Sequence, residues 1–233
     1  MGWPNNFVQG VYNALGSLIG VYDGAGGQIG LTPTYAWATK PLASAYTGFA
    51  FINDVAGGSL WYSNGTRWKP ANNHLILYDL AAPVAQTCGT EQIFASCTFP
   101  VNMLAIGDKF RIYLTMSKSA AVETATHSFN FGTAGTIADT LLTGGSTTIP
   151  GAANLMVGNI LEFKVTANNA IQRMGTGLTN GFDGAGTGAI TAATTTSNVT
   201  TNQMILTFST LSSAGAETYT MHDFSVELIT PAT

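Results

Sequence analysis

The chain is 233 residues long and carries a formal charge of −4, with 45% hydrophobic residues, only 9% charged residues and eight Lys and Arg in all. This length allows one large or two small domains, and a single β-sandwich of this size buries a sizeable core without a disulfide framework. So little positive charge argues against a surface that follows nucleic-acid phosphates, and no apolar run approaches the roughly 20 residues of a membrane-spanning helix.

The low content of charged residues also indicates which residue types cover the surface. Soluble domains usually carry roughly 25% charged residues, whereas this chain is rich in Gly, Thr, Ala, Ser and Asn. Such a composition fits threonine-rich strands joined by glycine turns, and it also fits chains whose surface is buried against identical partners. We therefore expect a homo-oligomer.

The first predicted element is an N-terminal attachment arm over residues 1–41. Apolar residues at spacings of three and four follow Pro4-Asn5-Asn6, which favours a short helix. Gly10 and Gly16 weaken such a helix by roughly 1 kcal/mol each relative to Ala. Two interpretations stay open, an anchor that docks on a larger assembly or joins subunits, and an irregular arm. The candidate attachment residues are Phe7, Val8, Val11, Tyr12 and Leu15.

A small aromatic β-hairpin module is predicted over residues 42–73. Asn64-Gly65 lies between Trp61-Tyr62 and Arg67-Trp68, and Asn-Gly can supply the two positive-φ positions of a type I′ turn. The aromatics Trp61, Tyr62 and Trp68 have two interpretations. They could stack on the apolar face of a sugar ring, or they could anchor the hairpin to a neighbouring sheet, which is the favoured interpretation.

From residue 74 to 233 the hydrophobic pattern has a period of two. In 109–116 the apolar residues alternate with Lys109, Arg111, Tyr113 and Thr115, so that one face of the strand is core and the other is wet or lies between subunits. The pattern predicts an antiparallel, jelly-roll-like β-sandwich rather than alternating β-α units. The remaining candidate strands are 75–80, 92–99, 124–131, 136–142, 161–165, 171–174, 189–196, 204–208 and 224–228.

No constellation of residues points to catalysis. His74, His127 and His222 are isolated from one another, and no Gly-X-Ser-X-Gly elbow occurs. The twelve Asp and Glu residues are scattered along the chain. A glycosidase needs two carboxylates that face each other across a cleft, and the sequence does not show which strands are paired. The glycine-rich turns at 23–27 and 183–188 each have one acid where a calcium loop supplies several oxygens. We therefore expect a non-enzymatic protein with no catalytic residue, no metal and no cofactor.

The order of these elements resembles a known family. The hairpin sequence GGSLWYSNGTRWKP at 57–70, preceded by 49–55 and followed by the run from His74 to Leu80, is similar to a module of tail fibres, tail spikes and other projecting proteins of tailed bacteriophages. The resemblance is best from about 42 to 142, where 82–84, 94–100, 103–108 and 129–132 follow the strand order of the family's C-terminal domain. Beyond 142 only the alternating pattern matches.

This resemblance implies a virion structural protein, assembled in the bacterial cytoplasm as a homotrimer and exposed on the particle. The first expectation is a tail fibre whose sandwich binds a host-surface receptor. Two alternatives stay open: a head fibre or decoration protein attached to the capsid through its N-terminal arm, and a host polysaccharide hydrolase. The expected partners are other copies of the chain, other virion proteins of the tail or capsid, and a host cell-surface glycan. The candidate contact loop holds Thr179, Asn180, Phe182 and Asp183.

The chain has two cysteines, Cys88 and Cys97. Along one extended strand their separation would be about 30 Å, which is too far for a disulfide, whereas a turn at Gly89-Thr90 would bring them together. Two free, half-buried thiols are the favoured interpretation, because phage-like particles assemble in a reducing cytosol.

Overall fold

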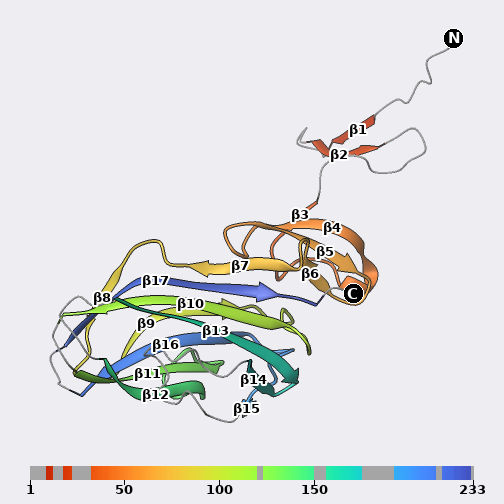
Figure 1. Ribbon diagram of the computed structural model, residues 1–233. Helices are drawn as coiled ribbons and strands as arrows, with labels where there is room; N and C mark the ends of the chain where they lie inside the picture. Colours follow the sequence, from red (N-terminus) through yellow and green to blue (C-terminus); the bar gives the residue numbers. More distant parts are fainter. Residues whose placement is uncertain are drawn as a thin grey trace. The chain divides into compact units, whose positions relative to one another are not determined.

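The structure, a computed structural model, describes residues 9–12, 18–22, 33–119, 123–149, 156–174, 192–213 and 217–231 (Figure 1). The chain divides into two compact units, Met1–Ala71 and Asn72–Thr233. The regular elements among the described residues are β-strands, apart from one short 3₁₀ helix, η1 (Ala43–Ala45), so the all-β prediction is confirmed. A helix of the length and hydrophobicity needed to cross a bilayer does not occur in the described part of the chain.

The N-terminal segment contains two short strands where a helix was predicted. β1 (Gln9–Tyr12) pairs antiparallel with β2 (Leu18–Tyr22), and Gly10 lies opposite Val21. The helix prediction is wrong for these residues because β-branched and aromatic residues favour strands while glycine penalises a helix. Of the candidate attachment residues, Val11 and Tyr12 lie in β1, and Phe7, Val8 and Leu15 lie outside the described residues.

The rest of the first unit is a four-stranded sheet in the order β3-β4-β5-β6. β3 runs parallel to β4, and the other pairs are antiparallel. Ala50 and Trp61 are paired on the buried face of the sheet, and Phe49 and Tyr62 are paired on the opposite face. The strands are β3 (Thr34–Tyr35), β4 (Thr47–Ile52), β5 (Ser59–Asn64) and β6 (Trp68–Pro70).

The predicted hairpin between β5 and β6 is confirmed, but its turn is not type I′. Gly65 has a φ of 83°, whereas Asn64 does not have a positive φ. The Oδ1 atom of Asn64 instead accepts hydrogen bonds from the N–H groups of Thr66 and Arg67, both at 3.0 Å. The side chain thus stabilises an Asx turn in which only the glycine needs a left-handed backbone.

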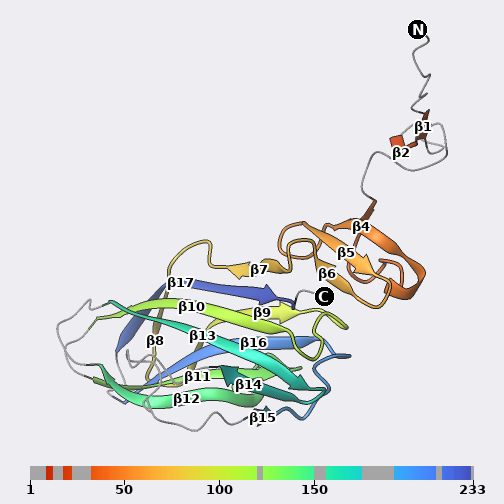
Figure 2. The ribbon, with the colours of Figure 1, turned by 45° about the vertical axis from the view of Figure 1, so that its right-hand side comes forward.

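The second unit is a sandwich of two antiparallel sheets, drawn as stacked layers in Figures 1 and 2. One sheet has the order β15-β14-β13-β10-β17-β7 with β8 also paired to β17, and the other has the order β12-β11-β16-β9. The sandwich prediction is confirmed. The strands are β7 (His74–Asp79), β8 (Val84–Thr87), β9 (Gln92–Phe99), β10 (Lys109–Lys118), β11 (Glu123–Gly132), β12 (Thr140–Ile149), β13 (Met156–Ala167), β14 (Ala170–Met174), β15 (Ala192–Thr194), β16 (Met204–Ser212) and β17 (Thr218–Ile229).

A cluster of phenylalanines fills the space between the two sheets. Phe110 on β10 stacks on Phe163 at 5.2 Å and on Phe131 at 5.5 Å, and it contacts Phe99 at 5.3 Å between ring centroids. All four rings are fully buried, and each contributes about 2–3 kcal/mol through burial. The predicted inward face of 109–116 is therefore confirmed, and its other face points away from the core.

Two predicted strands are shorter than expected. The segment 136–142 begins with a turn, because the Asp139 carboxylate accepts hydrogen bonds from the N–H groups of Ala134 at 3.4 Å and Thr136 at 3.0 Å, and β12 starts only at Thr140. The segment 189–196 contains a strand only over Ala192–Thr194 among its described residues. In the first of these segments, side-chain hydrogen bonding to the backbone outweighs the strand pattern.

The two cysteines are free thiols, as the favoured interpretation predicted, and both are buried rather than half-buried. Burial raises the pKa of Cys97 to about 12. This thiol therefore stays protonated and behaves as a small apolar core residue.

Candidate functional site

The two tryptophans of the hairpin module are core residues. Trp61 has no exposed surface and meets Trp37 edge to face, with ring centroids 4.8 Å apart. Its Nε1 donates a hydrogen bond to Ser59 Oγ at 2.8 Å. Trp68 is buried, stacks on Tyr46 at 5.3 Å and donates from Nε1 to the carbonyl of Pro41 at 2.9 Å. Neither indole has a free face for a sugar ring.

The other face of the module's sheet carries its exposed apolar residues. Phe49 is 50% exposed, and its ring lies 5.1 Å from that of the half-buried Tyr62 on the neighbouring strand. Phe51 and Leu60, paired across the same strands, are also exposed. Of the three aromatics singled out from the sequence, only Tyr62 lies on this open face. The sequence analysis missed Phe49 and Phe51, although their alternation with buried residues indicates that they share this face.

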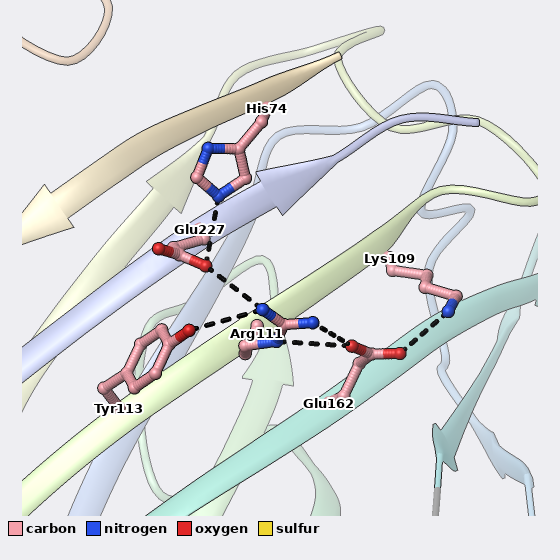
Figure 3. Close-up of polar contacts among 6 residues, drawn as sticks. All are labelled: His74, Lys109, Arg111, Tyr113, Glu162 and Glu227. Atoms are coloured by element: carbon pink, nitrogen blue, oxygen red, sulfur yellow. Dashed lines mark hydrogen bonds and ion pairs between the residues drawn. The ribbon is translucent and has the colours of Figure 1, made fainter. Parts of the chain in front are cut away.

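A second candidate lies on the outward face of the seven-stranded sheet (Figure 3). Arg111 of β10 is in register with Glu162 of β13 on one side and with Glu227 of β17 on the other. Antiparallel pairing brings such partners within reach of each other across adjacent strands. Charged residues from three strands therefore form one row.

Glu162 is the acceptor for two cations in this row. Its Oε2 accepts hydrogen bonds from Nη2 of Arg111 at 2.9 Å and from Nε at 3.3 Å. Its Oε1 accepts a hydrogen bond from Lys109 Nζ at 2.8 Å. Burial acts to raise the pKa of Glu162, but the hydrogen bonds and charges of Lys109 and Arg111 outweigh burial and hold this pKa below its ordinary value.

Glu227 continues the network toward β7. Its Oε2 lies 3.1 Å from Nε2 of His74 and 3.8 Å from Nη1 of Arg111. The same Nη1 donates to the hydroxyl of Tyr113 at 3.3 Å, and hydrogen bonds to Tyr113 and Glu162 raise the pKa of Arg111. Figure 3 shows these side chains linked to one another. They come from β7, β10, β13 and β17, so their geometry is held from several directions.

Apolar side chains flank this charged network on the same face. Ile160, in register with Tyr113, is 51% exposed, and Ile76, in register with Glu227, is 48% exposed. Each isoleucine lies one strand away from the β10–β17 pair, on opposite sides. The result is a surface with ordered polar groups at its centre and exposed apolar groups at its borders.

The other two histidines lie elsewhere in the sandwich. His127 is fully buried, its Nδ1 lies 3.0 Å from Thr210 Oγ1, and burial lowers its pKa to about 3, so it stays neutral at physiological pH. His222 is exposed, and its Nε2 lies 2.7 Å from Ser117 Oγ. That distance is what a nucleophile and its base require.

Metal binding finds no support in the described ranges. They contain no group of three or more His, Cys, Asp or Glu side chains arranged to hold an ion. The loop with Thr179, Asn180, Phe182 and Asp183 lies outside the described residues, as does the turn at 23–27.

The charged network was not predicted, because alternation places each of its charges on an outward face but does not reveal which strands are neighbours.

Two solved structures show distant likenesses to the chain. No protein-family profile and no curated protein sequence matches the chain. The CBM2 module of the evolved Dit of Lactobacillus casei BL23 phage J-1 is 12% identical, with a TM-score of 0.32 over 59% of this chain and 70% of that one. A chain of infectious bursal disease virus, Gx strain, is 10% identical, with a TM-score of 0.23 over 68% of this chain and 41% of that one. Likenesses this weak establish neither a shared fold nor a shared function.

Proposed function

We propose that this chain is a non-enzymatic structural protein of a bacteriophage virion, a tail fibre whose β-sandwich binds a receptor on the host surface. The observation that carries this proposal is the outward face of the seven-stranded sheet. There Arg111 is held between Glu162 and Glu227, and Ile76 and Ile160 are exposed beside them. A sheet face with fixed polar groups and apolar borders suits contact with the surface of another molecule.

The fibre would act as a homotrimer that carries three copies of this face. Several weak sites on one assembly can exceed the affinity of a single site by about 10² to 10⁴. The low charge of the chain, 9%, supports burial of part of its surface between copies. Size-exclusion chromatography with light scattering measures the mass of the purified chain in solution. A monomer at all concentrations would count against the trimer.

Infection assays test receptor binding. The purified full-length chain, added to susceptible bacteria before the phage, should block adsorption. Ile160→Asp should weaken the block by about tenfold or more, because it places an unpaired carboxylate in the contact. The matched control is Ile137→Asp, since Ile137 is 45% exposed in the turn before β12, on the other sheet. A wild-type chain that leaves adsorption unchanged would contradict the proposal.

A capsid head fibre is the second candidate. The two-stranded sheet of β1 and β2 has unpaired edges within the described residues, and such edges can accept a strand from another protein. In this arrangement the N-terminal segment would attach the protein to the capsid. The number of copies per virion separates the candidates, because a few tens of copies indicate the tail and hundreds indicate the head.

A polysaccharide hydrolase is the candidate from another class. The hydrogen bond between Ser117 and His222 at 2.7 Å is the local feature that favours it. Incubation of the isolated protein with host capsule or lipopolysaccharide should leave the polymer length unchanged. Cleavage that disappears in Ser117→Ala would replace the non-enzymatic proposal.

A further inference from the structure

Two lysines face each other at one end of the outward face described above. Lys109 of β10 is in register with Lys164 of β13, and like charges directly opposite each other destabilise a strand pair. The row continues through Ile229 of β17 to His74 of β7, and Gln172 of β14 lies on the other side of Lys164. Hydrogen-bond donors therefore occupy four of these five positions, although Nε2 of His74 lies 3.1 Å from Oε2 of Glu227.

The carboxylates near this row are already engaged. Glu162 accepts hydrogen bonds from Lys109 and Arg111, and Glu227 lies against His74 and Arg111. Among the described residues, no carboxylate oxygen lies within 4.0 Å of the ammonium group of Lys164. Within the part of the chain that the structure describes, Lys164 therefore lacks a counter-ion, whereas its neighbour Lys109 has Glu162.

The side chains at this end of the face carry a net positive charge. Lys109, Lys164 and Arg111 contribute three positive charges against two negative charges from Glu162 and Glu227, a balance of +1 with His74 neutral. The whole chain carries −4. A positive region on an acidic protein directs anionic groups to one place on its surface.

We propose that this basic row, Lys164 and Lys109 with Gln172, binds the anionic groups of an acidic polysaccharide. The inference rests on the proposed receptor-binding function and names the class of its ligand. The carboxylate or phosphate of the polymer occupies the place between the two ammonium groups and supplies the missing counter-ion. The sugar rings extend along the sheet toward Tyr113 and the exposed Ile160, where an apolar ring face finds an apolar partner.

An acidic polysaccharide fits this surface better than a nucleic acid does. Three cations clustered at one end of a sheet do not follow a backbone that carries a phosphate at every nucleotide, whereas one or two anionic groups of a sugar chain suffice to occupy this row. The flanking isoleucines also suit the mixed polar and apolar surface of a sugar chain. Single-stranded DNA is therefore an informative competitor, and strong binding of DNA would identify a general polyanion site instead.

Affinity electrophoresis of the full-length chain tests the proposal. Polygalacturonate supplies carboxylates, a phosphomannan supplies phosphates, and dextran of similar length is the neutral polymer. We expect one of the two acidic polymers to retard the protein, dextran to have no effect, and the retardation to weaken as salt rises. Lys164→Gln should weaken binding by roughly tenfold, the effect of losing one charge-assisted hydrogen bond, and Lys164→Arg should preserve it.

Asp79→Asn is the matched control. Asp79 is exposed on the same face, in register with Ser225, and its removal raises the net charge by one unit away from the basic row. Unchanged binding by this variant supports a local site. Equal retardation of wild type and Lys164→Gln, or stronger binding of every polyanion by Asp79→Asn, would overturn the proposal. Thermal unfolding of Lys164→Gln at or above the wild-type temperature confirms that the variant folds.

The two proposals fail in different ways. If Lys164→Gln blocks phage adsorption as well as the wild-type chain does, the receptor-binding function stands and the acidic-polysaccharide site is wrong. If the acidic polymer binds through Lys164 while the wild-type chain never blocks adsorption, the site stands and the tail-fibre function is wrong.

Discussion

Trp37 and Trp61 meet edge to face at 4.8 Å and close the core of the first unit. Trp61 lies on a strand of the hairpin, whereas Trp37 lies in the turn that follows β3. The contact joins the hairpin to a segment 24 residues earlier in the chain, as the numbers of the two residues show. The aromatic hairpin is therefore held by its own unit and needs no ligand to order its tryptophans.

Replacement of Trp61 by alanine tests this structural role. Because the indole is fully buried and loses both Trp37 and Ser59 as partners, Trp61→Ala should destabilise the first unit by about 3–5 kcal/mol. Denaturant unfolding followed by tryptophan fluorescence measures the change. Tyr62→Ala, on the open face, is the control and should cost about 1 kcal/mol. Equal unfolding midpoints for the two variants would contradict the burial of Trp61.

The turn of the hairpin gives a second prediction. Asn64→Ala removes the acceptor for the N–H groups of Thr66 and Arg67 and should cost about 1 kcal/mol, the usual value for a lost side-chain acceptor. Asn64→Asp keeps an acceptor oxygen and should retain most of the stability. If Asn64→Gly is instead the most stable of these variants, the turn prefers a left-handed backbone at this position and our description of it is wrong.

These residues also show what the sequence could reveal. Alternation along 109–116 placed the buried side of β10 correctly, because a strand whose core face is fully apolar has one possible orientation. Asn64-Gly65 located the turn but not its type, since asparagine can serve a turn either through a positive φ or through its side chain. The N-terminal pattern misled because a spacing of three and four can arise by chance in a short segment that contains glycines.

The charged network marks the limit of sequence reasoning. Arg111, Glu162 and Glu227 come from strands far apart in the chain, and only the sheet order β13-β10-β17 makes them neighbours. Alternation predicted an outward face for Lys109 and Arg111, but a period of two carries no information about the partner strand. For the same reason the opposition of Lys109 and Lys164 could not be predicted.

Gly132 should be sensitive to any side chain. A Cβ at this position would overlap the carboxylate and Cβ of Asp139, which accepts the hydrogen bonds of the turn before β12. Gly132→Ala should therefore cost about 1–3 kcal/mol, measured by urea unfolding. Gly158→Ala is the control within a strand, since its Cβ would come no closer than 3.4 Å to a neighbouring atom. Similar losses for both variants would show that the overlap with Asp139 is not the cause.

The buried His127 predicts a loss of stability in acid. Its pKa is lowered to about 3 in the folded chain and is about 6.5 when unfolded, so the unfolded chain binds more protons between these values. Stability should fall as pH falls through this window, by roughly 3 kcal/mol between pH 7 and pH 4 from this residue alone. His127→Phe should remove that part of the pH dependence in urea unfolding. An unchanged slope in the variant would assign the acid sensitivity to other groups.

Arg111 should control the ionisation of Glu162. Because its hydrogen bonds help to hold the pKa of Glu162 below its ordinary value, Arg111→Met should raise that pKa, while Lys109 alone continues to lower it. The stability that Glu162 contributes is present above its unfolded pKa and is lost as pH falls through its folded pKa, so in Arg111→Met this loss should begin at a higher pH. Carboxyl-carbon NMR titration of Glu162 measures the change directly. Tyr113→Phe removes only a hydroxyl partner of Arg111 and should leave the Glu162 titration in place; an equal shift in both variants would mean that the orientation of Arg111, rather than its charge, governs Glu162.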